Sequence, residues 1–297
     1  MSKSWKTLPL TCGTIVSMVE NRTDWGSPST KQGYDAMAVQ LRGCANGGFE
    51  TRVIDDAFCE EFARYLLAHV KPSSARGYME KLRTIMRRLK KDGLIAEMPV
   101  MDFKVLFPKA EEAEKVFLTK EELHRMQRAN CPSKSTKDAF LFSCYTGLMR
   151  GEVKGLLWDD IRYSGKGLVL SRPIENSDEH VKVPLVEPAR EILSSLEHDY
   201  SSLNKENQDD HVFHLPSNTT IRDHLCTWAK EAGIDKNINY MTSRHTFATM
   251  ALRAGVDLYV VSKWCGYSSV SAAQPYADLV GLNNLTSGDL LEAAFRG

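Results

Sequence analysis

An arginine and a tyrosine near the C-terminus, Arg244 and Tyr276, have side chains suited to covalent chemistry at a phosphate-like group. A guanidinium can hold two oxyanion oxygens at once, and a phenol can act as a covalent nucleophile. The tyrosine lies nine residues after Tyr267 (276 − 267), and we expect it to be exposed. Apolar residues at helical spacing predict a helix that directs Arg244 away from the apolar stripe; they are Phe247, Met250, Ala251 and Leu252.

The segment that positions these residues runs from 239 to 279. It predicts a helix carrying Arg244, a turn at Gly255, a second helix from about Leu258, a loop around residues 265–267 and a short amphipathic piece with Tyr276. In order, it contains Arg-His-Thr-Phe-Ala-Thr, Gly-x-Asp, Gly-Tyr-Ser-Ser and Tyr-Ala-Asp. This ordered pattern resembles the C-terminal signature of the tyrosine recombinase (phage integrase) family.

The resemblance implies a reaction at a DNA phosphodiester without a metal or other cofactor. Tyr276 would attack the phosphorus, giving a 3′-phosphotyrosine and a free 5′ hydroxyl, while Arg244 would hold the phosphate. Tyr267 stands where the family has histidine or tryptophan, and its hydroxyl could still donate one hydrogen bond to the phosphate. The family's histidine after the arginine is structural, so we expect His245 to be a packed or hydrogen-bonded core residue.

A second informative junction joins a buried helix, ending at Thr146 and Gly147, to a helix that starts near residue 150. The family has Thr-Gly-Leu-Arg-x-x-Glu here, and its arginine holds the scissile phosphate. Glu152 fixes the register, so Met149 occupies the arginine position and Arg150 comes one residue later. One residue turns a helical side chain by about 100°. Arg150 is therefore either a substitute phosphate ligand, if the turn is locally rewound, or a surface arginine.

Residues 167–171 and 180–185 alternate in the manner of strands and predict a small antiparallel sheet. In the family this hairpin carries a lysine that protonates the leaving 5′ hydroxyl, and that position is Asn176 here. Lys182 and Arg172 are nearby bases that could replace it, although a strand lysine is more often a solvated one.

The family signature is therefore incomplete. Met149, Asn176, Met241 and Tyr267 occupy four of its six positions. The family has a histidine three residues before the second arginine, where this chain has Met241, and methionine can neither take nor give a proton. General acid–base catalysis commonly contributes about 10² to 10⁴-fold per group, so cleavage would be slow unless other groups compensate. Two hypotheses follow: an active site-specific recombinase or integrase from a mobile element that uses Tyr276, or a catalytically impaired DNA-binding relative that assists or regulates a functional recombinase.

Composition sets broader limits. A chain of 297 residues with 42% hydrophobic and 26% charged residues is ordinary for one large or two ordinary globular domains. No apolar run approaches the roughly 18 residues of a membrane span, and the first residues lack the apolar core of a signal peptide; we expect a cytoplasmic protein with no membrane partner. The seven scattered cysteines favour reduced thiols over a disulfide framework or zinc site.

A basic ridge lies on a helix expected over residues 75–92, which follows another over 54–69. The formal net charge of the whole chain is zero, which argues mildly against non-specific nucleic-acid binding. Clustered basic residues can nevertheless occur in a chain whose net charge is zero. The plain alternative is a solvated helix face. The resemblance implies a DNA-clamping helical domain here; the bases are Lys81, Arg83, Arg87, Arg88, Lys90 and Lys91.

We expect a mainly α-helical fold with a small antiparallel sheet in the C-terminal domain, the two domains forming a clamp around double-stranded DNA. The predicted boundaries are 1–107 for the helical DNA-binding domain, 108–116 for a linker and 117–297 for the catalytic domain, which opens with a capping box at Thr119 and Glu122. Relatives place the helix over 219–232 in the major groove, where the candidate contacts are Arg222, His224 and Lys230.

The C-terminal piece, 282–295, has a short apolar face. The resemblance implies that it docks into a neighbouring protomer and links a homotetramer on DNA. Docking on its own core would bury the same face and stays an equal alternative. Accessory DNA-bending proteins are further expected partners.

Overall fold

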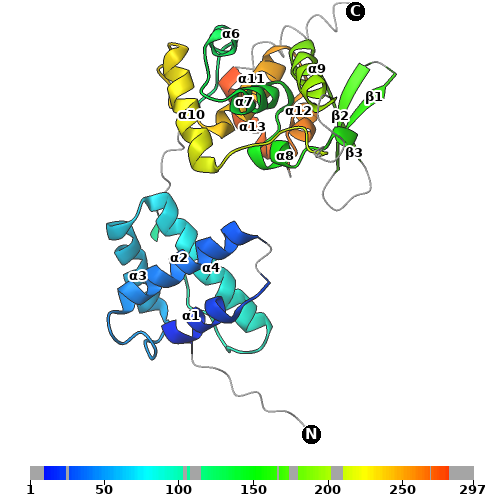
Figure 1. Cartoon of the computed structure of the whole chain (residues 1–297). Helices are drawn as coiled ribbons and strands as arrows, with labels where there is room; N and C mark the ends of the chain where they lie inside the picture. Colours follow the sequence, from blue (N-terminus) through cyan, green and yellow to red (C-terminus); the bar gives the residue numbers. More distant parts are fainter. Residues whose placement is uncertain are drawn as a thin grey trace, which may run out of the picture. The chain divides into compact units, whose positions relative to one another are not determined.

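The structure is a computed structural model that describes residues 10–24, 27–102, 106–107, 115–165, 167–173, 180–201, 210–267 and 269–280. It separates into two compact units, Met1–Ala113 and Glu114–Gly297, each with its own hydrophobic core (Figure 1). The described residues are mainly helical, with one three-stranded antiparallel sheet in the second unit. The predicted fold class is therefore confirmed.

The first unit is a helical bundle of α1 (Cys12–Asn21), α2 (Pro28–Ala45), α3 (Asp56–His69) and α4 (Pro72–Lys91). Helix α4 packs against α1, α2 and α3, and its apolar face is fully buried. Phe58 and Phe62 of α3 stack with their ring centroids 6.1 Å apart in this core. An isolated antiparallel bridge between Thr11 and Val53 ties the start of α1 to the segment before α3.

Helix α4 begins earlier than the sequence suggested. Pro72 takes the first turn and Lys71 the N-cap position, without a side-chain cap. The expected start at residue 75 is therefore too late, because proline, whose missing N–H is not needed in the first turn, starts the helix at Pro72.

The second unit is built around α7 and α11, which pack against each other at its centre (Figure 1). Helix α11 also contacts α10, α12 and α13, and α7 also contacts α8, α9 and α10. The helices are α6 (Lys120–Arg128), α7 (Lys134–Thr146), α8 (Arg150–Lys154), α9 (Glu187–Ser201), α10 (Asn218–Glu231), α11 (Tyr240–Arg253), α12 (Leu258–Trp264) and α13 (Gln274–Val280), with 3-10 turns at Trp158–Asp160 and Val270–Ala272.

The sheet has the order β1-β2-β3 and consists of β1 (Ile161–Ser164), β2 (Gly167–Pro173) and β3 (His180–Pro184). Leu170 and Val183 are buried register partners that anchor β2 and β3 on the core, and α12 packs against β3. Strand β1, which the sequence pattern did not reveal, lies at the sheet edge and exposes Tyr163.

Local signals determine where the central helices start and stop. The predicted capping box of α6 is confirmed. The Thr119 hydroxyl accepts a hydrogen bond from the Glu122 amide at 3.2 Å, and the Glu122 carboxylate accepts one from the Thr119 amide at 2.7 Å. Helix α7 ends at Gly147, whose φ of 74° lies in the left-handed region, as the sequence predicted. The chain then turns directly into α8.

No helix in the described parts of the chain is long and apolar enough to span a membrane. All seven cysteines are free thiols, and five of them are buried. Burial raises the pKa of the Cys12 thiol to about 12 and that of the Cys44 thiol to about 11, so both stay protonated at neutral pH.

Replacing Gly147 by alanine is expected to destabilise the second unit by about 2 to 4 kcal/mol, the sum of left-handed strain and overpacking. A Cβ atom there would lie 2.6 Å from the Phe247 ring and 3.3 Å from the Cys265 sulfur. Urea denaturation followed by tryptophan fluorescence measures the effect, since Trp228 and Trp264 belong to this unit. Gly151→Ala is the control: nothing lies within 4 Å of its Cβ position, so unchanged or slightly raised stability is expected. Equal stability of both variants would contradict the argument.

Candidate active site and nucleic-acid interface

Arg244 is the buried cation of α11. Its side chain is only 5% exposed. Its Nε donates to the Gly147 carbonyl at 2.7 Å, and its Nη2 forms an ion pair with Glu152. A buried charge needs such compensation, and both partners come from the α7–α8 junction. The two segments singled out in the sequence therefore meet at this guanidinium.

Glu152 also organises the start of α8. Its Oε2 accepts from the Met149 amide at 2.6 Å, so Met149 is the N-cap and Arg150 the first helical residue. The cap uses only main-chain atoms of Met149, a residue that is 40% exposed. The same carboxylate oxygen thus stabilises the helix start and pairs with Arg244.

Arg150 is half-buried and makes no hydrogen bond or ion pair with the residues that the structure describes. It lines a cavity of about 360 Å³ together with side chains of α10 and the start of α11. Arg244 is not among the described residues that line this cavity. The full lining consists of Met149, Arg150, Asn218, Ile221, Arg222, Leu225, Asn239, Tyr240 and Met241. Two of the positions where the family signature is altered, Met149 and Met241, thus share one largely apolar cavity.

Tyr276 is 2% exposed, so the prediction of an exposed tyrosine is wrong. It lies on α13, which packs against α11 and turns the phenol inward. Its hydroxyl lies 2.7 Å from His245 Nδ1 and accepts a hydrogen bond from the Tyr267 hydroxyl at 3.1 Å. The rings of Tyr267 and Tyr276 are stacked with their centroids 6.2 Å apart, and Arg244 Cζ lies 5.8 Å from the centroid of the Tyr267 ring. Arg244 and Tyr276 therefore both contact Tyr267.

Electrostatic conditions around the phenol are mixed. Burial raises the pKa of Tyr276, while the hydrogen bond from Tyr267 and the Arg244 charge act in the opposite direction. The pKa of Tyr267 is raised mainly by burial. The pKa of His245 is lowered, first by burial and then by the charges of Lys115 and Arg244, so its imidazole is neutral at pH 7.

Lys115 is a site residue that the sequence did not point to. It lies just before α6, and its Nζ is 5.4 Å from the centroid of the Tyr276 ring. No motif or helical pattern surrounds this lysine in the sequence, so only the fold reveals its proximity to Tyr276.

Lys182, the candidate general acid, lies on the sheet. Lys182 is exposed on β3, opposite Ser171 of β2, and has no hydrogen bond or ion pair with described residues. Asn176, the position where the family has its lysine, lies outside the described residues, as does the C-terminal piece over 282–295.

The predicted basic ridge of α4 contains paired and unpaired charges. Arg83 pairs with Glu80, and Lys81 Nζ lies 6.0 Å from the centroid of the Tyr34 ring. In contrast, Arg87 and Lys91 are exposed, and their side chains make no hydrogen bond or ion pair with the described part of the chain. The Lys90 side chain is also exposed and has no hydrogen bond or ion pair with described residues. The ridge therefore has fewer unpaired cations than the sequence suggested.

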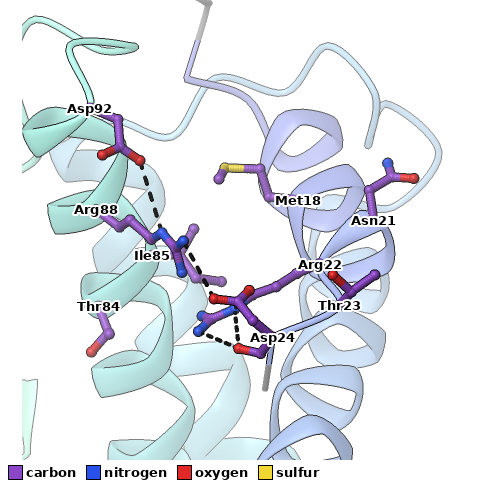
Figure 2. Close-up of a pocket in the computed structure, with 9 residues that line it drawn as sticks. All are labelled: Met18, Asn21, Arg22, Thr23, Asp24, Thr84, Ile85, Arg88 and Asp92. Atoms are coloured by element: carbon purple, nitrogen blue, oxygen red, sulfur yellow. Dashed lines mark hydrogen bonds and ion pairs between the residues drawn. The ribbon is translucent and has the colours of Figure 1, made fainter. Parts of the chain in front are cut away.

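Arg88 points into a cavity of about 520 Å³ between the end of α1 and α4 (Figure 2). Its guanidinium lies 3.7 Å from Asp24 and 3.9 Å from Asp92. Asp24 also pairs with Arg22 at 3.0 Å. The cavity therefore contains a balanced network of two arginines and two aspartates, which favours contact between α1 and α4 over anion binding.

Helix α10 exposes two of its three predicted contacts. Arg222 is exposed and lies 3.5 Å from Asp223, and Lys230 is exposed near the end of the helix. His224 is half-buried, with its Nδ1 3.0 Å from the Thr136 hydroxyl, which ties it to α7.

Family models match both units. The model described as the phage integrase family matches residues 116–280, more than half of the chain. The chain belongs to this family. The phage integrase SAM-like domain matches residues 13–105, in the first unit.

Similar proteins agree with this assignment. The tyrosine recombinase XerD of Lacticaseibacillus casei is 28% identical over 218 residues, 70% of this chain and 73% of that protein. XerD of Listeria innocua is 28% identical over 222 residues, 71% and 73% of the two chains. The chain also resembles the solved structure of the Tn1549 transposon integrase in complex with circular intermediate DNA, with a TM-score of 0.70, 15% identity and coverage of 90% and 95%. For XerH recombinase bound to a palindromic difH substrate, the TM-score is 0.66 at 11% identity, covering 98% and 100%. The likeness to these two structures shows the fold.

Glu152→Gln is expected to destabilise the second unit by about 2 to 4 kcal/mol, because it leaves the buried Arg244 charge without its counter-ion. Glu187→Gln is the matched control: its partner Arg190 lies three residues along α9, and the carboxylate side chain is 66% exposed. Surface pairs of this kind contribute roughly 0 to 1 kcal/mol. Urea midpoints of the two variants give the comparison, and equal midpoints would rule out the buried pair as a main stabilising contact.

Proposed function

We propose that this chain is a site-specific DNA recombinase that cleaves and rejoins DNA strands through a 3′-phosphotyrosine at Tyr276. The observation that carries the proposal is the convergence of Arg244 and Tyr276 on Tyr267, in a chain of the phage integrase family. Relatives with the name tyrosine recombinase support the same reaction class. Because its substrate would be DNA, the reaction belongs in the cytoplasm.

Arg244 is suited to the role of phosphate ligand. Its Nε and Nη2 already have protein partners, which fix the plane of the guanidinium. Nη1 has no hydrogen bond to the described residues and can donate to a phosphate oxygen. Fixed donors of this kind stabilise charge that develops in the transition state without reorganising.

The remaining roles are assigned by chemistry and position. Arg150 would contact the phosphate from the start of α8, where it is half-buried and unpaired among described residues. Tyr267 would donate a hydrogen bond to a phosphate oxygen once Tyr276 leaves it. Lys182, an exposed base on β3, would protonate the leaving 5′ oxygen.

The DNA would be gripped by both units as a clamp. Two exposed cations of α4 without a described partner, Arg87 and Lys91, and two exposed cations of α10, Arg222 and Lys230, would contact the phosphate backbone. Recombination joins four DNA ends, so we propose a homotetramer on double-stranded DNA, linked by the C-terminal segment and assisted by DNA-bending proteins.

A second function is favoured by the cavity at Met149 and Met241. Two thioether side chains stand there where the family has an arginine and a histidine, and neither can bind an anion or move a proton. This supports a catalytically impaired relative that binds recombination sites and assists or regulates an active recombinase.

A covalent adduct decides between the two functions. The probe is a pool of nicked duplexes with randomised sequence, from which adducts are isolated under denaturing conditions. The recombinase is expected to form an adduct that Tyr276→Phe abolishes, since phenylalanine lacks the nucleophilic hydroxyl. Enrichment of specific sequences in native binding, with no adduct from the wild-type chain, would instead establish the impaired relative.

The Arg87→Ala/Lys91→Ala double variant is expected to weaken binding to a random-sequence duplex and to flatten its salt dependence. Each lost phosphate contact lowers the slope of log K against log salt by about 0.9. Fluorescence anisotropy over a range of NaCl concentrations measures this slope. Lys31→Ala is the control, because Lys31 pairs with Asp35 on α2 at 3.2 Å. An unchanged slope in the double variant would remove the α4 ridge from the interface.

A further inference from the structure

The hydrogen bonds around Tyr276 have a defined direction. The Tyr267 hydroxyl donates to the Tyr276 oxygen at 3.1 Å. The single proton of the Tyr276 hydroxyl is then available for the other neighbour, His245 Nδ1, at 2.7 Å. This distance lies within the roughly 2.6 to 3.2 Å expected between a general base and the proton that it abstracts.

The imidazole is held in place for this contact. His245 is a half-buried residue of α11, directly after Arg244, and its ring centroid lies 5.5 Å from that of Tyr276. Because α11 packs against α13, the two side chains approach each other from facing helices. The imidazole is thus fixed by the helix that also fixes the phosphate-binding arginine.

The charges around the pair act on both of its members. Burial, and after it the charges of Lys115 and Arg244, lower the pKa of His245, so the ring is unprotonated at neutral pH and can accept a proton. Lys115 lies 5.4 Å from the centre of the Tyr276 ring, where a cation stabilises a phenolate more than a phenol. The other ionisable groups at the site are the thiol of Cys265 and the hydroxyl of Tyr267, whose pKa is raised mainly by burial.

We infer that His245 is the general base that takes the proton of Tyr276, and that Lys115, whose Nζ lies beside the Tyr276 ring, is a positioning cation for this pair. The inference rests on the proposed recombinase function and names its nucleophile-activating residues. The family resemblance assigns His245 a structural role. Here the histidine position at residue 241 is methionine, which cannot accept a proton, whereas His245 contacts the nucleophile itself.

The chemical step balances without an added reagent. The proton of the Tyr276 hydroxyl moves to His245 Nδ1 as the phenol oxygen forms its bond to phosphorus. The bond from phosphorus to the 5′ oxygen breaks with its electron pair, and that oxygen takes a proton from solvent or from Lys182. The products are a 3′-phosphotyrosine, a free 5′ hydroxyl and an imidazolium, and rejoining reverses each transfer.

His245→Asn separates a catalytic from a structural role. Asparagine can accept the phenol hydrogen bond from a similar position to Nδ1, but it cannot take up a proton. With nicked duplexes that the wild-type chain cleaves, we expect His245→Asn to slow adduct formation by about 10² to 10⁴-fold. The rate of adduct formation by the wild-type chain should fall at low pH, and this fall should be absent in His245→Asn. Wild-type rates in His245→Asn would overturn the inference while leaving the recombinase function intact.

Two further measurements locate the defect. A substrate with sulfur in place of the bridging 5′ oxygen has a leaving group that needs no proton. It should rescue Lys182→Met but leave His245→Asn slow, and rescue of His245→Asn would overturn the assignment. Lys115→Gln should raise the pKa of His245 and shift the low-pH decline to higher pH, whereas Lys120→Gln, an exposed lysine of α6, should not. Equal profiles for both variants would remove Lys115 from the mechanism.

A titration without DNA completes the test. In ¹⁵N-histidine spectra of the full chain, His245, assigned by comparison with His245→Asn, should carry its proton on Nε2 and titrate below pH 6.5, the ordinary value. A proton on Nδ1 at neutral pH would overturn the inference whatever the activity. If the wild-type chain forms no adduct with any duplex while the Nε2 tautomer is observed, the recombinase function fails, and the catalytic role of His245 fails with it.

Discussion

The candidate site depends on a guanidinium that is removed from water and whose charge therefore needs compensation within the fold. Arg244 achieves this through the Gly147 carbonyl and the Glu152 carboxylate, which lie at the end of α7 and in the first turn of α8. The interaction joins three helices at one point and fixes the direction of the charge. Left-handed backbone at Gly147 is what lets the carbonyl and the carboxylate reach the same side chain.

The phenol is held by a different kind of constraint. Tyr276 belongs to a seven-residue helix that has no independent stability, and its position follows from packing on α11. Its hydroxyl is saturated by Tyr267 on one side and His245 on the other. Helix α11 thus carries Arg244 and is also the helix on which α13, with Tyr276, packs. The sheet and α9 lie outside this cluster and support it through α12 and α7.

Sequence reasoning predicted the parts that local chemistry determines. The capping box of Thr119 and Glu122, the helix end at Gly147 and the order of helices around Arg244 all follow from short-range patterns. Strand β1 was missed because it lies at an edge and exposes Tyr163 instead of alternating. The burial of Tyr276 and the approach of Lys115 could not be predicted, since both arise from contacts between segments far apart in the chain.

The shared carboxylate of Glu152 has a consequence for local dynamics. Helix α8 has five residues, too few for an isolated helix to persist, so its first turn relies on the oxygen that also pairs with Arg244. The two interactions are thermodynamically linked, and linkage is reciprocal. An anion that competes for the guanidinium would strengthen the hold of Glu152 on the α8 amide, and fraying of α8 would in turn change the affinity of Arg244 for that anion.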